Sequence, residues 1–149
     1  MWSAKKSLAF SKICTVFFMA LLAGGAICAA WIVRELVKSS VSAAAAGLTP
    51  FLITIYLGCI PAAILLICLY FLLRRIGAGD VFIAGNVKTL RYISWCCFAG
   101  GAICAASALY YVPWIAVGVA AAFMGLIVRV VKNVVAKAVS LQDDVDLTI

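Results

Sequence analysis

The stretch Asp80–Ala106, DVFIAGNVKTLRYISWCCFAGGAICAA, joins a basic internal loop to a strongly apolar helix. Its last eight residues, AGGAICAA at 99–106, repeat residues 23–30 letter for letter. Lys12 and Lys88 precede the two copies at the same offset of 76 residues. The repeat indicates a parallel duplication of a two-helix hairpin, or a chance identity in a chain rich in Ala, Gly, Ile and Cys.

The composition places the chain in a lipid bilayer. Of its 149 residues, 68% are hydrophobic and only 11% are charged, which is far from the balance of a soluble domain. A helical span needs about 20 apolar residues, so the length leaves room for four spans and short connections. We therefore expect an all-α membrane protein, a single integral membrane domain over 1–149 with four transmembrane helices arranged as two helical hairpins.

The apolar runs place the spans at about 10–33, 48–73, 90–109 and 113–131. The alanine run at 43–46 could extend the second span toward the N-terminus. Beyond Val128 the apolar residues recur on one side of a helix, which predicts an amphipathic extension of the fourth helix along the membrane surface. The segment 129–149 combines this amphipathic helix with an acidic tail, and both are expected to be cytoplasmic.

The N-terminal segment resembles a secretory signal, because three lysines precede its apolar run and small residues follow at 26–30. The run is longer than the usual apolar core of a signal, which is about 7 to 15 residues. The same octapeptide also recurs in an internal span. We therefore expect the first helix to be retained.

Orientation follows from the lysines and arginines near the span ends. Ten of the twelve lie in the N-terminal segment, the middle loop and the C-terminal segment, whereas Arg34 and Lys38 lie in the other connections. Both termini and the middle loop of the multi-pass protein are therefore predicted to be cytoplasmic.

Small residues at four-residue spacing form ridges on the first and third spans, where close backbone approach would let helices associate in lipid. These helix-packing residues are Gly24, Gly25, Cys28, Gly100, Gly101 and Cys104. The two spans are the expected central contact of the protein. The alternative is homodimerisation through one ridge.

The sequence offers little catalytic chemistry. It has no histidine, its five acids lie outside the apolar runs, and no ionisable residue is buried in a span, because Lys12 and Arg129 lie at the cytoplasmic span ends. The seven cysteines lie inside apolar runs and are interpreted as packing residues. We therefore expect no enzyme activity, no cofactor and no metal. The charge of +7 sits between apolar runs, which disfavours direct nucleic acid binding and makes the lipid bilayer the expected partner.

The loop pattern around Phe82, Asn86, Val87, Lys88 and Leu90, together with the ending 146–149 (DLTI), resembles a family of small bacterial four-span membrane proteins, domain of unknown function 2975. In that family a Ser or Thr usually follows the phenylalanine, then acidic residues, whereas Ile83, Ala84 and Gly85 stand here. Asp80 is then the possible N-cap of the next helix. The resemblance implies a multi-pass protein of the bacterial inner membrane, in a family without an established activity. It implies a small helix-turn-helix regulator, often encoded beside family members, as a partner.

We therefore expect a membrane-embedded regulatory or interaction protein whose cytoplasmic loop and tail bind a small DNA-binding regulator. The candidate interaction residues are Phe82, Asn86, Lys88, Leu90 and Arg91 in the loop, with Asp144, Asp146, Leu147 and Ile149 in the tail. The basic loop and the acidic tail could instead bind each other as a structural latch. The alternative function is a small channel, exporter component or immunity-type membrane protein, in which Thr54 and Ser94 would matter more than the tail.

Overall fold

The computed structural model describes residues 4–148, and their regular structure is entirely helical. The helices are α1 (Ala4–Ser39), α2 (Val41–Ala46), α3 (Leu48–Gly77), α4 (Ala84–Ser107) and α5 (Trp114–Leu147). Three of them, α1, α3 and α5, are long and apolar enough to cross a membrane, as expected of a membrane protein. The predicted span at 90–109 corresponds to α4, which does not belong to this set.

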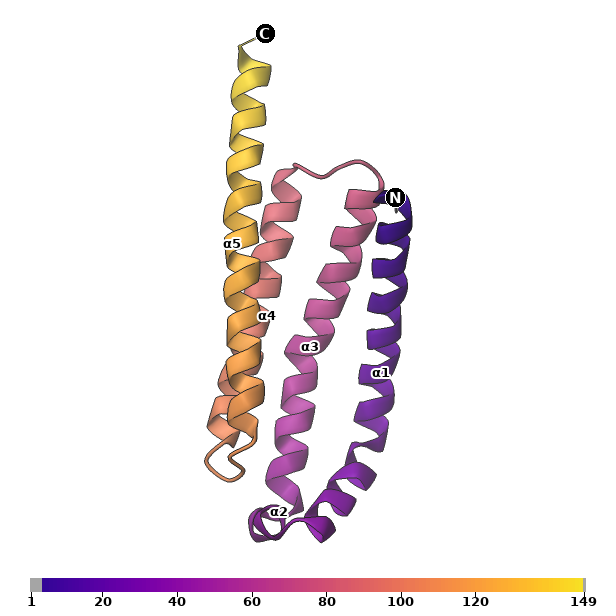
Figure 1. Ribbon diagram of the computed structural model, residues 1–149, viewed down its shortest axis with the longest axis vertical. Helices are drawn as coiled ribbons and strands as arrows, with labels where there is room; N and C mark the ends of the chain where they lie inside the picture. Colours follow the sequence, from indigo (N-terminus) through magenta and orange to yellow (C-terminus); the bar gives the residue numbers. More distant parts are fainter. Residues whose placement is uncertain (1–3, 149) are drawn as a thin grey trace.

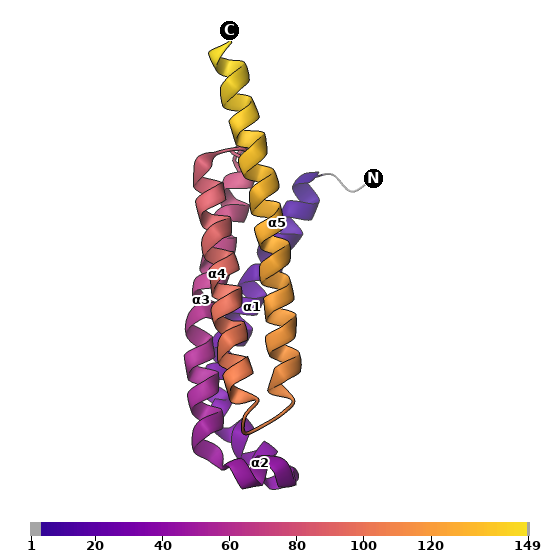
Figure 2. The ribbon, with the colours of Figure 1, turned by 90° about the vertical axis from the view of Figure 1, so that its left-hand side faces the viewer.

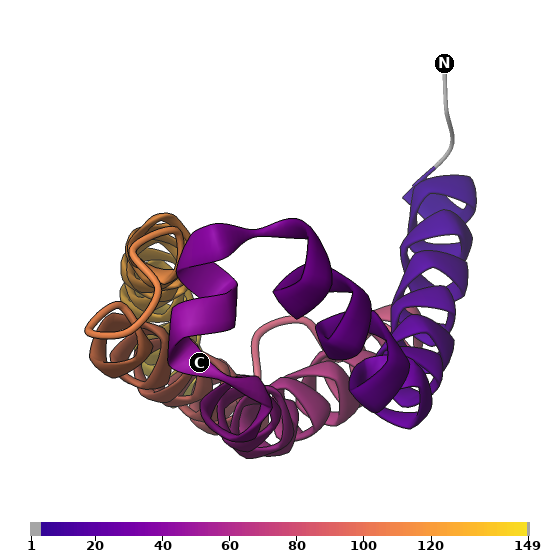
Figure 3. The same cartoon turned by 90° about the horizontal axis from the view of Figure 1, so that it is seen from below.

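The four long helices stand in a curved row that follows the order of the chain (Figures 1 and 3). α1 packs against α3, α3 against α4, and α4 against α5, with the most extensive contact between α4 and α5. α1 with α3 and α4 with α5 form two antiparallel hairpins. The expected central contact between the first and third spans is wrong, because α3 lies between α1 and α4 and occupies the face on which they would have met.

One end of the row carries the N-terminus and the loop 78–83, and we call it the loop end (Figure 1). The other end, which we call the turn end, carries α2 and the turn 108–113. At the turn end Gly47 adopts a φ of 80°, a conformation that suits glycine. This change of direction ends α2 and lets α3 start at Leu48, so residues 43–46 do not extend the second span.

At the loop end, α3 stops at Gly77, and Gly79 turns the chain with a φ of 98°. The extended residue Ile83 then occupies the N-cap position of α4 without a side-chain hydrogen bond. Asp80 is therefore not the N-cap. The helix starts three residues too late for that, and the Asn86 side chain, from inside α4, holds the loop backbone instead.

Two small cores hold the ends of the row together. At the loop end, Leu72, Leu90, Ile93 and Cys97 are buried between α3 and α4. At the turn end, Val33, Ala43 and Phe51 are buried among the residues of α1, α2 and α3. Most other large apolar side chains point outward, such as Ile27 at 82% exposure and Phe123 at 62%. An apolar exterior of this kind is typical of a protein surrounded by lipid tails.

α5 is a single helix of 34 residues, and its C-terminal part continues past the loop end along the same direction as the rest of the helix (Figures 1 and 2). The predicted helical extension beyond 129 is therefore confirmed. No glycine or proline follows Gly125, and the helix stays unbroken there. The predicted path of this part along the membrane surface stays a prediction.

Candidate functional site

Asn86 fixes the shape of the loop at the loop end. Its side chain is 1% exposed, and its Nδ2 donates hydrogen bonds to the carbonyl oxygens of Asp80 (2.7 Å) and Val81 (2.9 Å). Its Oδ1 is buried and has no hydrogen-bond partner. One turn later, Leu90 is 8% exposed and belongs to the core between α3 and α4. Two of the predicted interaction residues therefore hold the loop and its helix in place.

The other predicted loop residues are open to the surroundings. Phe82 is 49% exposed and precedes α4, so it does not share a helical face with Asn86 and Leu90. Lys88 and Arg91 are exposed on α4. Arg75, at the end of α3, donates from Nη1 to Thr89 Oγ1 at 3.3 Å and so ties α3 to the start of α4.

The C-terminal candidates lie at the far end of α5, where Asp144, Asp146 and Leu147 are all exposed. Ile149 lies outside the described residues. Within residues 4–148 the tail acids form no ion pair with the basic loop, and the one ion pair of this part of the chain joins Lys38 to Glu35 on α1 at 2.8 Å. The structure therefore does not bring the loop and tail candidates together.

Glycines bring α4 and α5 into backbone contact along a seam. A Cβ atom placed on Gly101 would lie 3.1 Å from the carbonyl oxygen of Gly118. Two turns along α5, a Cβ on Gly125 would lie 3.1 Å from the Cβ of Cys97. Ser94 Oγ donates to the carbonyl oxygen of Gly125 at 3.0 Å, which adds a hydrogen bond between the two helices. Close backbone approach and interhelical hydrogen bonds both favour the association of helices in lipid.

The small-residue ridges have different surroundings on the two helices. Gly101 and Cys104 lie at the contact with Gly118 on α5. By contrast, Cβ atoms on Gly24, Gly25 and Gly100 would meet nothing within 4 Å, and Cys28 is exposed. The residues of α5 that complete the seam, Gly118 and Gly125, were not predicted. Their spacing of seven residues puts them on one helical face, which was the available signal.

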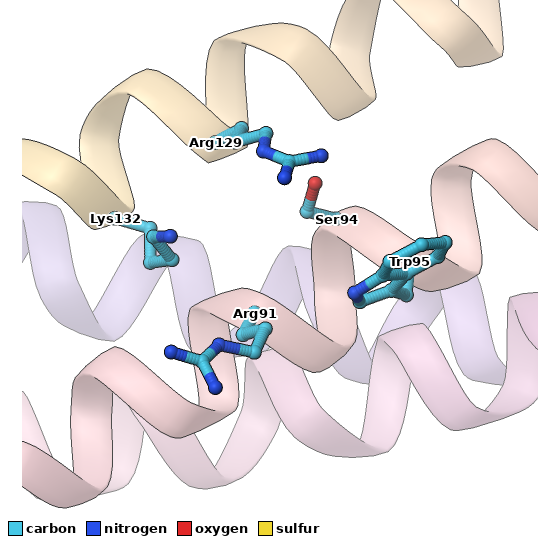
Figure 4. A pocket seen from close by; sticks show the side chains of 5 residues that line it. All are labelled: Arg91, Ser94, Trp95, Arg129 and Lys132. Carbon is cyan, nitrogen blue, oxygen red and sulfur yellow. The ribbon is translucent and has the colours of Figure 1, made fainter.

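The seam ends, toward the loop end, in a basic hollow between α4 and α5, with a volume of about 210 Å³. We call it the basic pocket. It is lined by Arg91, Ser94, Trp95, Arg129 and Lys132 (Figure 4). The hydroxyl of Ser94 points toward the Arg129 guanidinium (Figure 4). The Arg91 guanidinium points away from the Arg129 guanidinium (Figure 4). Of these residues, Arg91 was predicted as an interaction residue, and Ser94 was named only for the alternative channel or exporter function.

At the turn end, buried hydroxyls connect α3 to α4 and the following turn. Ser107 Oγ donates to the carbonyl oxygen of Ile103 at 2.8 Å, so its oxygen is free to accept. Thr54 Oγ1 lies 2.6 Å from Ser107 Oγ and 2.7 Å from Tyr110 Oη. Each hydroxyl has one proton, so Ser107, which donates to the backbone, accepts from Thr54. The Tyr110 hydroxyl then serves both Thr54 Oγ1 and the carbonyl oxygen of Pro50, which lies 3.2 Å from Tyr110 Oη.

Among residues 4–148, no three His, Cys, Asp or Glu side chains come together in a way that could hold a metal ion. The exposed side chains that stand out among the described residues are the basic ones of the pocket and the large apolar ones. Side chains of these kinds are suited to bind anions, helices or lipids.

A comparison with protein-family models shows the family of this chain. The model of the family described as "Protein of unknown function (DUF2975)" matches residues 34–149. The chain belongs to this family. The resemblance seen in the loop and in the C-terminal residues is therefore confirmed. No curated protein and no solved structure matches the chain. The match includes α2 to α5, and therefore the basic pocket, the seam and the hydroxyl chain.

Proposed function

We propose that this protein of the DUF2975 family is a four-span protein of the bacterial inner membrane, with α4 as its fourth span. α4 has 24 residues, which at 1.5 Å per residue gives a length of about 36 Å. This exceeds the roughly 30 Å of the bilayer hydrocarbon core. α4 also packs between α3 and α5, two helices that are themselves long and apolar enough to cross. The position of α4 between two such helices supports a total of four membrane spans.

The proposed orientation has the loop end and both termini in the cytoplasm. The N-terminus and the α3–α4 loop share one end of the row, and α5 leaves the row there (Figure 1). Ten of the twelve lysines and arginines belong to segments at this end, whereas Arg34 and Lys38 belong to the turn end. The positive-inside rule favours this arrangement.

The function we infer is that of a membrane-embedded regulatory or interaction protein without catalytic activity. The observation that carries it is the free C-terminal part of α5. Val134, Ala138, Leu141 and Val145 recur at intervals of four, three and four residues, which puts them on one face of the helix. Val134, Leu141 and Val145 are 64%, 53% and 57% exposed. A helix that carries an uncovered apolar stripe into water is suited to pair with another helix.

The partner we propose is a small DNA-binding regulator of the helix-turn-helix kind, as the family resemblance implies. The end of α5 supports this proposal through its charge, because Asp143, Asp144 and Asp146 are exposed and residues 142–148 contain no lysine or arginine. A DNA-binding domain carries a basic surface, so an acidic helix end is complementary to it. Binding at the membrane would compete with DNA for that surface.

A small channel, exporter component or immunity-type protein is the alternative. It would need polar side chains along a path between the helices. The hydroxyls of Thr54 and Ser94 are instead engaged in hydrogen bonds between neighbouring helices. This engagement favours the interaction function over the alternative.

The test is a pull-down from the native membrane with the full-length protein and two double variants. Leu141→Asp with Val145→Asp adds two charges to the apolar stripe, whereas Asn133→Asp with Ser140→Asp adds two charges to another face of the same segment. We expect a small DNA-binding protein, identified by mass spectrometry, to be retained by the wild type and the control but lost from the stripe variant. Equal recovery with all three proteins, or with none, contradicts the proposal. Ion flux across reconstituted vesicles would then test the alternative.

A further inference from the structure

The helical spacing of the basic pocket explains how its charges meet. On α4, Ser94 lies three residues after Arg91 and Trp95 lies four residues after it, so both are on the same face of the helix as Arg91. On α5, Arg129 lies one turn after Gly125 and Lys132 nearly one turn further. Because the Ser94–Gly125 hydrogen bond aligns the two faces, the glycine seam places the basic residues of both helices around one hollow.

These cations lack a protein counter-charge. Among residues 4–148, Arg91, Arg129 and Lys132 take part in no ion pair. Like charges held near one another repel, and the repulsion is stronger beside an apolar protein surface than in bulk water. The divergent guanidinium groups of Arg91 and Arg129 in Figure 4 agree with such repulsion. An anion between them would remove it, and the planar fork of arginine matches the oxygens of a phosphate group.

The surroundings of the pocket point to the source of the phosphate. Trp95, which is 61% exposed, lines the basic pocket and also an apolar groove of about 470 Å³ between α3 and α4. The groove includes Leu57, Ile64 and Ile103. Tryptophan is enriched where apolar and polar parts of a membrane meet. A charged hollow that adjoins an apolar groove at a tryptophan has the layout needed for a lipid headgroup and its chain.

We propose that Arg91, Arg129 and Lys132 bind the phosphate group of an anionic phospholipid, with an acyl chain of the same lipid in the groove beside Trp95. The site is built from α3, α4 and α5 and does not involve the stripe on the free end of α5. The proposed membrane orientation decides only which leaflet the lipid comes from, which is the cytoplasmic one. Loss of the regulator partner would therefore leave the lipid site intact, and the two proposals can fail separately.

The experiment uses native mass spectrometry of the full-length protein in detergent, titrated with phosphatidylglycerol, phosphatidylcholine or inorganic phosphate. The pocket variant combines Arg91→Gln, Arg129→Gln and Lys132→Gln. The control combines Lys5→Gln, Lys6→Gln and Lys137→Gln, which removes the same charge from the same end of the protein. A basic residue contributes roughly fivefold to the binding of an anionic lipid. We therefore expect affinity for phosphatidylglycerol to fall on the order of 100-fold in the pocket variant and to stay at the wild-type value in the control.

The three arms also distinguish the sources of the phosphate. Tight binding of phosphatidylglycerol with weak binding of phosphatidylcholine and inorganic phosphate supports the lipid site. Equally tight binding of inorganic phosphate that is lost in the pocket variant retains the phosphate site but overturns its assignment to a lipid. Equal affinities of the pocket variant and the control overturn the proposal. If the pocket variant loses its helical circular-dichroism signal, Arg129→Gln alone replaces it, with an expected drop of about fivefold and the same criterion.

Discussion

Gly101 and Gly118 hold the backbones of α4 and α5 in reciprocal contact. A Cβ atom on either glycine would lie 3.1 Å from the carbonyl oxygen of the other. The contact involves backbone on both sides, so neither helix can make room for a side chain by a change of rotamer. The relationship fixes the distance between the two helices, and with it the alignment of the basic pocket.

Replacement of Gly101 by leucine is expected to separate α4 from α5 and to lower the free energy of unfolding by about 1–3 kcal/mol. The matched control is Gly100→Leu, which adds the same side chain one residue away, where nothing lies within 4 Å of the new Cβ. Unfolding by sodium dodecyl sulfate in mixed micelles, followed by circular dichroism, measures both changes. Similar stability of the two variants would contradict the close contact.

Thr54→Val removes a hydroxyl that bonds both Ser107 and Tyr110 at almost constant side-chain volume. Hydrogen bonds between membrane helices contribute on average about 0.6 kcal/mol and at most about 1.7 kcal/mol, so we expect a loss of about 1 kcal/mol. Tyr110→Phe should cost a similar amount. The double variant should cost less than the sum of the two, because both changes remove the same link. Additive losses in this double-mutant cycle would show that the hydroxyl chain does not act as a unit.

Asn86→Asp replaces an amide donor by an acceptor of the same shape, opposite the carbonyl oxygens of Asp80 and Val81. We expect the loop to lose its fixed conformation and the protein to be destabilised by about 1–3 kcal/mol. Lys88→Gln, an exposed change on the same helix, is the control. Limited proteolysis at Arg74 and Arg75 should become faster in the Asn86 variant only. Unchanged cleavage rates in both variants would mean that other contacts hold the loop.

Four spans put the two ends of the chain on the same side of the membrane, whereas three spans put them on opposite sides. We expect short epitope tags before Met1 and after Ile149 both to be protected in intact spheroplasts. Both tags should become accessible to antibody in inside-out vesicles. A periplasmic marker and a cytoplasmic marker control the sidedness of each preparation. Opposite accessibility of the two tags would exclude α4 as a complete span.

The apolar runs were sufficient to place most helices, because a membrane helix is long and its ends are marked by charged or breaking residues. The second predicted span and α3 both start at Leu48, and the amphipathic pattern beyond 129 predicted the continuation of α5. α2 was missed because four consecutive alanines favour a helix without indicating where it stops. The positive φ of Gly47 ends α2 at Ala46.

The octapeptide repeat shows why helix contacts were harder to predict. Gly25 and Gly101 hold equivalent positions in two identical sequences, yet Gly101 is buried against α5 and Gly25 has open space beside it. A lipid tail is as apolar as a leucine side chain, so the pattern of apolar residues does not distinguish a face that meets lipid from one that meets protein. The choice is made by the partner helix, here through Gly118.

The candidate site was predictable only in part for a related reason. Asn86 and Leu90 were selected from a local pattern, and both are buried at the structured start of α4. The basic pocket combines Arg91 with Arg129 and Lys132, which are far apart in sequence. Their proximity depends on the register between α4 and α5, which the seam glycines and the Ser94 hydrogen bond determine.

The curved row of helices has a consequence for how the protein is made. Each long helix packs against the one that is synthesised immediately before it, and α1 and α5 share no extensive contact. In the proposed four-span arrangement, every new helix can therefore dock against the previous one in the membrane without displacing an earlier neighbour. Such sequential contacts keep loop closure short and favour rapid assembly. The order of synthesis and the order of packing are the same in this protein.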